Sequence, residues 1–507
     1  MRVVLRTRLI VGLVSVATAA TMALSPGSAQ AVSPAEVAAP APCVGQTAAE
    51  TALLAGSCGQ FESLTFESGK TPTREVHVAL TGNDTTGTGS AASPYRTLLK
   101  GVSSATPGTA VRIHAGTYGG VTIVNNVFGS ATAPIWIGGV AGEARPVITG
   151  MLLLQKFHHV VVHDVEIAFT GGHGLQITDN ADRTNPWAAF AIVVRDSKFH
   201  DLLASGVACI KMAGVNDFWI YDNEFANCST GGQQIDMVGC HTGRILWNTM
   251  TSATASLQNL MIKGGSKNIT VRGNRFTDTS NTSDTGIWLG GGGTGGAFFR
   301  PPLSDPEPNY QASGISIVAN LFLGGWRSAV RHSGDVNTRV THNTIVNPRD
   351  FVIRLLQEDS EEADGGVTYP LVQTQGGLWQ ANVIYFDSDK LFDMPNGQPE
   401  YVNIGAGGLP ATFTWNQNLW YAWNNTAESV PTNLPSTQTG ALFVDPQFVG
   451  SGADPYALKS TSPARYAAVN IPDYFNPTTA INGDLVKQCY PSPADALRSS
   501  MGAYASH

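Results

Sequence analysis

The chain has 507 residues, a formal net charge of −8, and 13% charged against 42% hydrophobic residues. This balance excludes the generally basic surface of a nucleic-acid-binding protein. After the first 31 residues no apolar run reaches the ~18 residues that a membrane helix needs. The length and the 55 glycines suit one long repeat domain that buries a continuous core.

Residues 1–31 have the pattern of a signal peptide. Arg2, Arg6 and Arg8 form the basic start, an apolar run follows, and small residues end at Ala31. We expect cleavage there and a secreted protein. Cleavage removes three arginines and no acids, which takes the formal charge to −11.

Residues 32–74 form an Ala/Pro-rich segment. An even number of cysteines in an exported chain predicts disulfides, although six cysteines allow 15 pairings. We favour a Cys43–Cys58 bridge, because it would tie down this loose segment. The six cysteines are Cys43, Cys58, Cys209, Cys228, Cys240 and Cys489. None has zinc-site spacing, so their predicted role is structural.

The β domain is expected to span residues 75–507, with an irregular C-terminal part. It opens with a short strand from Val76, a Gly/Thr/Asp loop, a helix over 95–104, a Pro-Gly turn and the strand "AVRIHAG". Such a helix would cover the open end of a coil stack, where backbone groups lack partners.

One phrase then recurs along the chain, with alternating apolar residues, an Asp or Asn, and a further apolar pair, as in "FWIYDNEFAN" and "ITVRGNRFTD". Its polar positions are Asp164, Asp196, Asn223, Asn248, Asn274, Asn320, Asn343, Asn382 and Asn418. Intervals of 27, 25, 26 and 23 residues, with longer ones at insertions, indicate a β-solenoid. A propeller would need periods of roughly 40–50 residues. Asn at a fixed turn tolerates left-handed backbone, and its amide can bond along the stack.

The strands about a dozen residues before these turns are expected to be equivalent from coil to coil. Their alternation turns one residue of each strand outward, and neighbouring rungs lie ~4.8 Å apart. The outward residues predicted to stack are Lys211, Asp236, Lys263, Trp288, Arg331 and Arg354. Lys263 stands 11 residues before its Asn, whereas most of the others stand 12 before theirs, and the Gly264–Gly265 turn is expected to absorb the difference.

These residue types suit an acidic sugar. Arginines fork carboxylates, and Trp288 can stack on a sugar ring. A long insertion after Gly290, "GGGTGGAFFRPPLSDPEPNYQAS", is expected to form a binding wall, with Phe299 and Arg300 closing over ligand and His332 at the rim. A second insertion, "EDSEEADGGVTYPLVQ", lacks the spacing of a calcium loop, so we expect a solvated acidic loop.

The coil phrases, the opening helix and the late phrases "FVDPQFVG" and "LKSTSPAR" resemble the pectate-lyase-like superfamily. This resemblance implies an all-β, right-handed parallel β-helix with an N-terminal capping helix, secreted and acting on acidic polysaccharides. It implies a lyase in which a lysine or arginine accepts the proton beside the uronate carboxylate, while an arginine or Ca²⁺ neutralises that carboxylate. Lys263, Arg300 and Arg331 are the candidates for these catalytic roles.

The remaining candidates, Lys211, Asp236, Trp288, Phe299, His332 and Arg354, are expected to contact substrate. The rung of Lys263 is similar to that of the alginate lyase and chondroitinase B family, where acidic calcium ligands precede the lysine. Ser256 and Gln258 stand there in this chain. Calcium therefore stays an open candidate with no ligand set assigned.

Electrostatics on the predicted rungs opposes catalysis by Lys263. At an effective dielectric of 20, Asp236 one rung away would attract the ammonium by ~3.5 kcal/mol, and Lys211 two rungs away would repel it by ~1.7 kcal/mol. Asp236 is thus expected to keep Lys263 protonated, whereas desolvation under the insertion acts the other way.

Three alternatives to the lyase remain. A glycoside hydrolase would need a second carboxylate facing Asp236, for example Asp335 or Glu358. An epimerase would use the same base, and a carbohydrate-binding surface protein would use none. We expect a monomer whose partner is an acidic polysaccharide, with neither nucleic acid nor membrane.

Overall fold

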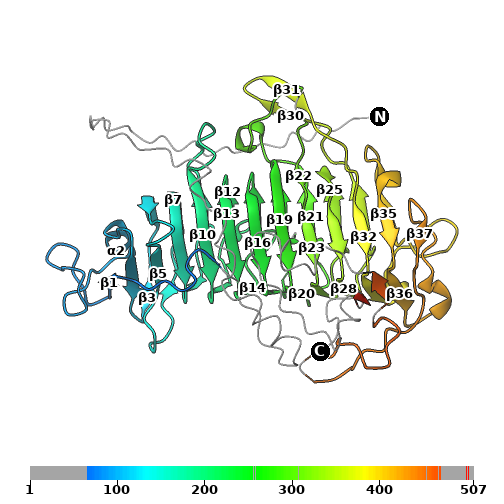
Figure 1. Cartoon of the computed structure of the whole chain (residues 1–507), viewed down its shortest axis with the longest axis horizontal. Helices are drawn as coiled ribbons and strands as arrows, with labels where there is room; N and C mark the ends of the chain where they lie inside the picture. The colour runs from blue at the N-terminus through cyan, green and yellow to red at the C-terminus, as the bar shows by residue number, and fades with distance from the viewer. Residues whose placement is uncertain are drawn as a thin grey trace, which may run out of the picture. The chain divides into compact units, whose positions relative to one another are not determined.

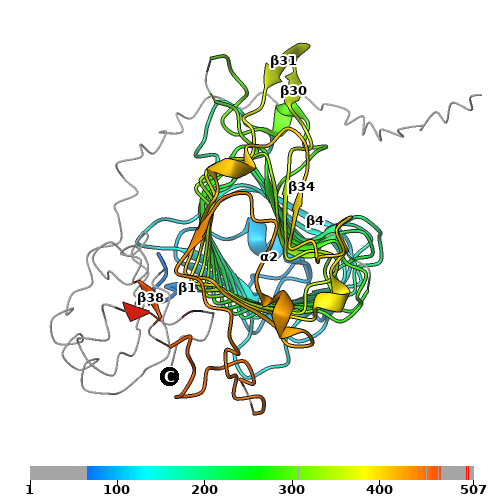
Figure 2. The ribbon, with the colours of Figure 1, turned by 90° about the vertical axis from the view of Figure 1, so that its right-hand side faces the viewer.

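The computed structural model describes residues 65–254, 256, 258–306, 308–452, 454–465, 467–469, 498–499 and 501. Over this part of the chain the predicted parallel β-helix is confirmed, because each coil adds one short strand to each of its walls, and the strands of a wall pair in parallel. Figure 1 shows the strands side by side, and Figure 2 shows the walls around a common centre. The predicted signal peptide and the Cys43–Cys58 bridge lie outside the described residues.

Three walls can be followed through the strand pairs, and β7 is long enough to take part in the first two. The first wall contains β4 (Thr122–Phe128), β7 (Leu152–His163), β9 (Leu175–Thr178), β12 (Ala208–Ala213), β15 (Gln233–Val238), β18 (Gln258–Lys263), β21 (Thr285–Gly290), β25 (Ser328–Ser333), β29 (Ile353–Leu356) and β34 (Val402–Ile404). The second contains β1 (Arg74–Val78), β2 (Thr109–Ile113), β5 (Ile135–Gly139), β10 (Ala189–Arg195), β13 (Asn216–Tyr221), β16 (His241–Leu246), β19 (Ser266–Arg272), β22 (Ala312–Ser313), β23 (Ser316–Val318), β26 (Asp335–Val336), β27 (Arg339–Thr341), β32 (Leu378–Gln380), β35 (Thr414–Asn416) and β37 (Gln438–Thr439). The third contains β3 (Thr117–Tyr118), β6 (Val147–Ile148), β8 (Glu166–Ala168), β11 (Lys198–His200), β14 (Glu224–Ala226), β17 (Thr249–Ser252), β20 (Arg275–Asp278), β24 (Leu321–Leu323), β28 (Thr344–Val346), β33 (Val383–Phe386) and β36 (Leu419–Ala422).

The predicted capping helix is present as α2, Leu98–Ser103. Thr97 caps it by accepting a hydrogen bond from the Lys100 N–H at 3.2 Å. Leu98 and Val102 are buried against the coils, and α2 contacts β1, β2 and β4. The helix therefore covers the apolar interior at the first coil (Figures 1 and 2).

The predicted asparagine stack exists and is buried in the turns between the second and third walls. The side-chain amide of each member donates to the Oδ1 of the next at 2.9–3.0 Å, through Asn223, Asn248, Asn274, Asn320, Asn343, Asn382 and Asn418. Each Oδ1 from Asn248 onward also accepts the backbone N–H of the preceding member. The ladder thus satisfies buried polar groups that the strands leave unpaired.

Two residues that the sequence analysis assigned to the asparagine stack lie one position before it in the turn. Asp164 and Asp196 have φ of 50° and 52°, and they correspond to Asp222, the left-handed residue before Asn223. Ser197 holds the ladder position in its coil, where its N–H donates to Asn223 Oδ1 at 3.1 Å. The left-handed residue and the amide ladder are therefore neighbouring positions of the turn, and Asp suits only the first.

Elements outside the walls include two antiparallel pairs and four short 3₁₀ turns. The pairs are β30 (Glu361–Asp364) with β31 (Val367–Pro370), and β38 (Ala468–Val469) with β39 (Arg498–Ser499); the turns are η1 (Gly296–Phe298), η2 (Ser388–Lys390), η3 (Pro410–Thr412) and η4 (Thr426–Ser429). In both Figures 1 and 2 the β30–β31 hairpin projects from the coils. No helix in the described ranges is long and apolar enough to cross a membrane.

The cysteine prediction is answered in part. Cys209 and Cys228 form a disulfide between β12 and the loop after β14. Cys240 is a free, buried thiol, and burial raises its pKa to about 12. The bridge links positions 19 residues apart, so it closes one coil on itself.

Candidate functional site

The outward face of the first wall carries the predicted column, with one change of register. Strand pairing aligns Lys211 with Asp236, then Trp288 with Arg331 and Arg331 with Arg354. The rung between Asp236 and Trp288 is occupied by Met261, not Lys263. Lys263 also faces outward, but it lies two residues further along β18 and pairs with Val238.

The displacement of Lys263 originates in the Gly264–Gly265 turn. Val238 pairs with Lys263, and His241 pairs with Lys267, so the turn after β18 is one residue longer than the turn after β15. The sequence interpretation shortened the coil where the protein lengthens it. Because side chains alternate with a period of two, a shift of two residues along the strand keeps a side chain facing outward while its neighbour on the next strand changes.

The same turn explains the two glycines beside Lys263. The insertion after β21 passes directly over it, and the Arg300 N–H donates to the Gly264 carbonyl at 3.1 Å. A Cβ on Gly265 would lie 2.4 Å from the Arg300 carbonyl oxygen, and one on Gly239 would lie 2.8 Å from the Arg300 side chain. Glycine is required here because backbone approaches backbone.

Lys263 is buried, with a relative exposure of 9%. Its ammonium makes no hydrogen bond or ion pair with any residue that the structure describes. Burial lowers the pKa of Lys263 below the usual lysine value; Asp236 opposes this shift, and the positive charge of Lys211 adds to it. Asp236 therefore favours the protonated form, as expected, but burial has the larger effect and the net shift of the Lys263 pKa is downward.

Asp236 has a different partner. Lys211 Nζ donates to Asp236 Oδ2 at 2.5 Å, and both side chains are largely buried. This ion pair compensates the carboxylate, and the register shift moves Lys263 two residues along β18, so that it no longer lies directly beside Asp236. Desolvation of Lys263 consequently outweighs the attraction.

The side chains of Arg300 and Phe299 are turned towards the protein itself. Arg300 makes two contacts with Asp179 Oδ2, from Nε at 2.8 Å and from Nη2 at 2.7 Å, and its Nη1 donates to the Ala297 and Phe299 carbonyls. Burial raises the pKa of Asp179, although Arg300 counteracts this. Phe299 is 1% exposed and packs with Leu303 and other residues. Both residues fasten the insertion to the coils, which corrects the expected placement of Phe299 against substrate.

His332 is also placed differently from the prediction. It is fully buried, with its Nδ1 2.7 Å from Asp335 Oδ2 and its Nε2 accepting from Trp379 Nε1 at 3.3 Å. Because Arg331 points outward, alternation along β25 turns His332 into the interior. A substrate-binding role for His332 is therefore wrong, and Asp335 is equally buried.

The arginines of the column are paired with acids that sequence reasoning did not assign to them. Arg331 stacks on the Trp288 ring at 3.8 Å from its centroid and forms ion pairs with Asp284 at 2.7 Å and with Glu358. Arg354 lies 3.5 Å from Asp284. Asp284 stands immediately before β21. Its pairing with these arginines depends on which strands are neighbours in the wall, so the sequence around Asp284 does not indicate it.

Several buried polar atoms on the strands of the first wall and its insertions also lack a partner within the described residues. They are Asp236 Oδ1, Gln258 Oε1, Trp288 Nε1, Thr294 Oγ1 and Asp359 Oδ2. Asp236 and Asp359 both act on the charge of Lys263. A concentration of such atoms at one place is typical of a site that takes a polar ligand.

The residues preceding Lys263 do not form a calcium site. Gln258 Nε2 donates to Met261 Sδ at 2.9 Å, and Ser256 bonds to Ser252 and Ser283. Among the described residues no group of three or more His, Cys, Asp or Glu side chains is arranged to hold a metal ion.

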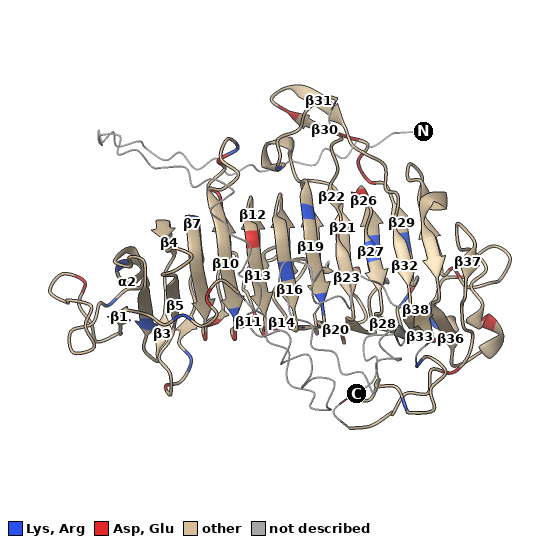
Figure 3. Cartoon of the chain, in the orientation of Figure 1, with Lys and Arg blue, Asp and Glu red and all other residues tan. Residues whose placement is uncertain are grey.

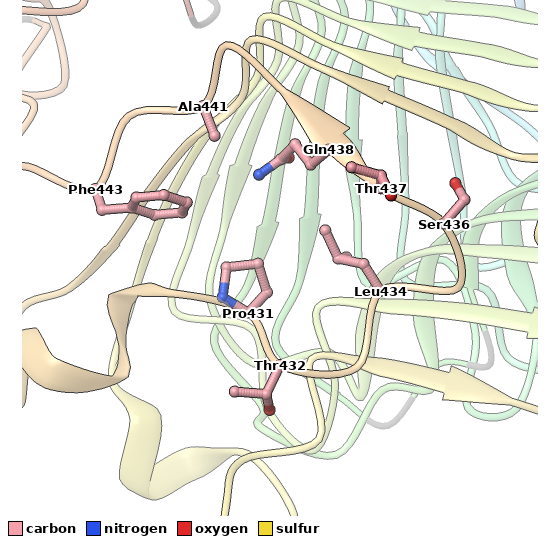
Figure 4. Close-up of a pocket in the computed structure, with 8 residues that line it drawn as sticks. All are labelled: Pro431, Thr432, Leu434, Ser436, Thr437, Gln438, Ala441 and Phe443. Atoms are coloured by element: carbon pink, nitrogen blue, oxygen red, sulfur yellow. The ribbon is translucent and has the colours of Figure 1, made fainter.

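Two cavities lie away from Lys263. One cavity, of about 530 Å³, lies at the last coil, and Figure 4 shows the side chains that line it. A groove of about 640 Å³ runs over the second wall and is lined by residues including Thr270, Ser316 and Arg339. Neither is lined by a carboxylate, a histidine or a lysine, so neither offers an acid or a base. The first-wall cluster is therefore the candidate site on chemical grounds.

In Figure 3 charges of both signs are interspersed over the coils.

Comparisons with known proteins agree with the architecture. A family model described as a right handed beta helix region matches residues 149–300. Similar solved structures include the pectate lyase Pel9A (TM-score 0.49, 12% identity, 87% of this chain and 98% of that one) and a rhamnogalacturonan lyase (0.43, 14%, 85% and 100%). A third is an alginate lyase from Paenibacillus sp. str. FPU-7 (0.42, 13%, 67% and 99%). No curated protein matches the sequence. At such identities and TM-scores these likenesses say nothing about substrate or activity. The matched family model and the strand pairing together assign this chain the right-handed parallel β-helix fold.

Proposed function

We propose that this protein is an extracellular polysaccharide lyase that cleaves a uronic-acid-containing polymer by β-elimination on the first wall, with Lys263 as the base. The observation that carries the proposal is the buried ammonium of Lys263, which has no partner in the described part of the chain and whose pKa is lowered by burial. A general base must lose its proton near the working pH, and desolvation is the means of achieving this with lysine.

The reaction assigns a simple task to each group. Lys263 Nζ accepts the proton from the carbon next to the uronate carboxylate, and the freed electron pair forms a carbon–carbon double bond. The bond from the adjacent carbon to the glycosidic oxygen breaks, and that oxygen leaves with a proton from water. The positive charge of Lys211 lowers the pKa of Lys263. We therefore assign Lys211 to binding the substrate carboxylate, which would compete with Asp236 for the Lys211 ammonium.

The test is a screen of the purified protein on pectate, alginate, glucuronan and glycosaminoglycans. We expect one of them to yield an unsaturated uronate end, seen as new ultraviolet absorbance. In Lys263→Met the value of kcat should fall by about 10²–10⁴-fold, the usual contribution of a general base. The control is Lys198→Met, because Lys198 lies on the third wall and is paired only loosely with Glu224, at 3.7 Å.

Full activity of Lys263→Met would refute this assignment of the base. New reducing ends without unsaturation would refute the lyase and favour a glycoside hydrolase. Asp236 and Asp359 each have a buried oxygen without a partner in the described ranges, and this observation favours the second candidate, since a hydrolase needs two carboxylates about one bond.

A further inference from the structure

We propose that Arg327, Arg331 and Arg354 form a second anion-binding subsite on the first wall, here termed the arginine subsite, and that Glu358 is its built-in competitor. The ligand is a carboxylate or sulfate group of the same acidic polymer, at a sugar distant from the one that reacts. The inference rests on the proposed function only in the identity of the polymer, and the test below distinguishes failure of the subsite from failure of the proposed function.

Apart from Glu358, the three guanidinium groups of the arginine subsite are paired with two carboxylates, Asp284 and Asp350, so one positive charge is left over. The three guanidinium groups converge on the single carboxylate of Asp284, at 2.7 Å from Arg331, 3.5 Å from Arg354 and 3.7 Å from Arg327. Of the three, Arg327 also pairs with Asp350 at 2.8 Å. Burial and then the charge of Arg331 lower the pKa of Arg354 to about 10. A further anion is therefore stabilised at this place.

Arg331 is held in a fixed orientation that suits a bidentate ligand. The Trp288 ring lies against its guanidinium at 3.8 Å, and its Nη1 donates to Asp284 at 2.7 Å. Its Nη2 forms an ion pair with Glu358. Stacking and the rigid carboxylate position the planar group, so the edge facing Glu358 is ready for any carboxylate.

Glu358 is the partner that a ligand can replace. It lies in the segment between β29 and β30, outside the walls, and its side chain is 27% exposed. Asp284 stands directly before β21 and its side chain is 17% exposed. Exchanging Glu358 requires rotation of one accessible side chain, whereas exchanging Asp284 requires movement of the wall.

The distance between the two sites indicates which part of the polymer each one binds. Arg331 is two rungs from β18, which is roughly 10 Å along the coil axis. One sugar unit of an extended chain advances by about one rung spacing. A polymer lying along the first wall therefore reaches the arginine subsite about two sugars from Lys263, and a disaccharide at Lys263 does not reach it.

The test measures the affinity of tetrasaccharides and disaccharides of galacturonate, mannuronate, guluronate and glucuronate by calorimetry, in a Lys263→Met background that prevents turnover. Glu358→Gln should bind the tetrasaccharide of the preferred sugar about 10-fold more tightly, equivalent to about 1.4 kcal/mol. Its affinity for the disaccharide should not change. Glu361→Gln is the matched control, because Glu361 is an exposed acid three residues further along, at the start of β30. Adding Arg331→Met to Glu358→Gln should abolish the gain.

Each other outcome overturns the inference. Equal tetrasaccharide affinity with and without Glu358→Gln refutes the competitor while leaving the lyase intact. An equal gain for disaccharide and tetrasaccharide places the effect at Lys263 and refutes the distal subsite. Failure of every acidic oligosaccharide to bind any variant refutes the subsite together with the proposed function.

Discussion

The asparagine ladder permits a direct test of what holds the coils in register. Asn274 is 1% exposed, and its amide makes five hydrogen bonds: two received from Asn248 and three donated to Ile245, Arg272 and Asn320. Asn274→Ala removes all five without altering the strand pattern. The ladder is therefore probed without disturbing the apolar core.

The cost follows from the groups left behind. The Asn248 backbone N–H has no other acceptor among the described residues, and orphaning a buried N–H costs about 1–3 kcal/mol. The Asn248 side chain keeps its bond to Ile220, so its loss is smaller. With part of the remaining bonds included, we expect Asn274→Ala to destabilise the protein by about 3 kcal/mol.

The assay is amide hydrogen exchange over β16–β20 together with urea unfolding, because coils of a solenoid can open locally. Asn125→Ala is the control, since Asn125 is an exposed asparagine on β4, and it should change stability by under ~0.5 kcal/mol. Asn274→Asp should be worse than Asn274→Ala at neutral pH, because a carboxylate would face carbonyl oxygens, and should recover in acid. Equal stability of Asn274→Ala and Asn125→Ala would refute a supporting role of the ladder.

Three further predictions concern stability. The folded pKa of Lys263 lies below its unfolded value of 10.5, so between these two values the unfolded chain binds more protons. Thermal stability should therefore rise as the pH passes through the folded pKa towards 10.5, and Lys263→Met should remove this rise; an unchanged slope would contradict the burial. Glu67→Gln weakens the ion pair between Glu67, which precedes β1, and Arg195 of β10 at 2.8 Å and should cost about 1.5–3 kcal/mol in urea unfolding; a loss below ~0.5 kcal/mol would contradict a stabilising role of this ion pair. Replacing Cys209 and Cys228 by alanine opens a loop of 19 residues and should cost about 3 kcal/mol in the same assay; a cost no greater than that of Cys240→Ala would contradict a stabilising bridge.

Parts of the site were predictable because they depend on local periodicity. Lys211, Asp236, Trp288, Arg331 and Arg354 face outward in one column, as alternation before the Asn turns indicated. The same rule applied to β25 would have placed His332 inside. The position of Lys263 along its strand was mispredicted, because the length of a glycine turn cannot be read from the alternation of side chains.

The partners of these residues were not predictable from local pattern. Arg300 meets Asp179 across 121 positions of sequence, and the partner of Arg331 in the second insertion, Glu358, follows the strand of the next coil. Such contacts depend on how the insertions fold back over the wall. They decide that Arg300 fastens a loop and that Lys263 is desolvated.

The sequence by itself determined the coil period, the capping helix, the asparagine turns and the face on which charged side chains gather. These features arise from short-range rules, since alternation of side chains and turn chemistry act within a single coil. Only the tertiary structure decided which charges are neutralised and which are not, because desolvation and ion pairing depend on segments that approach from distant coils. The ammonium of Lys263, buried without a partner among the residues that the structure describes, is a result of that second kind.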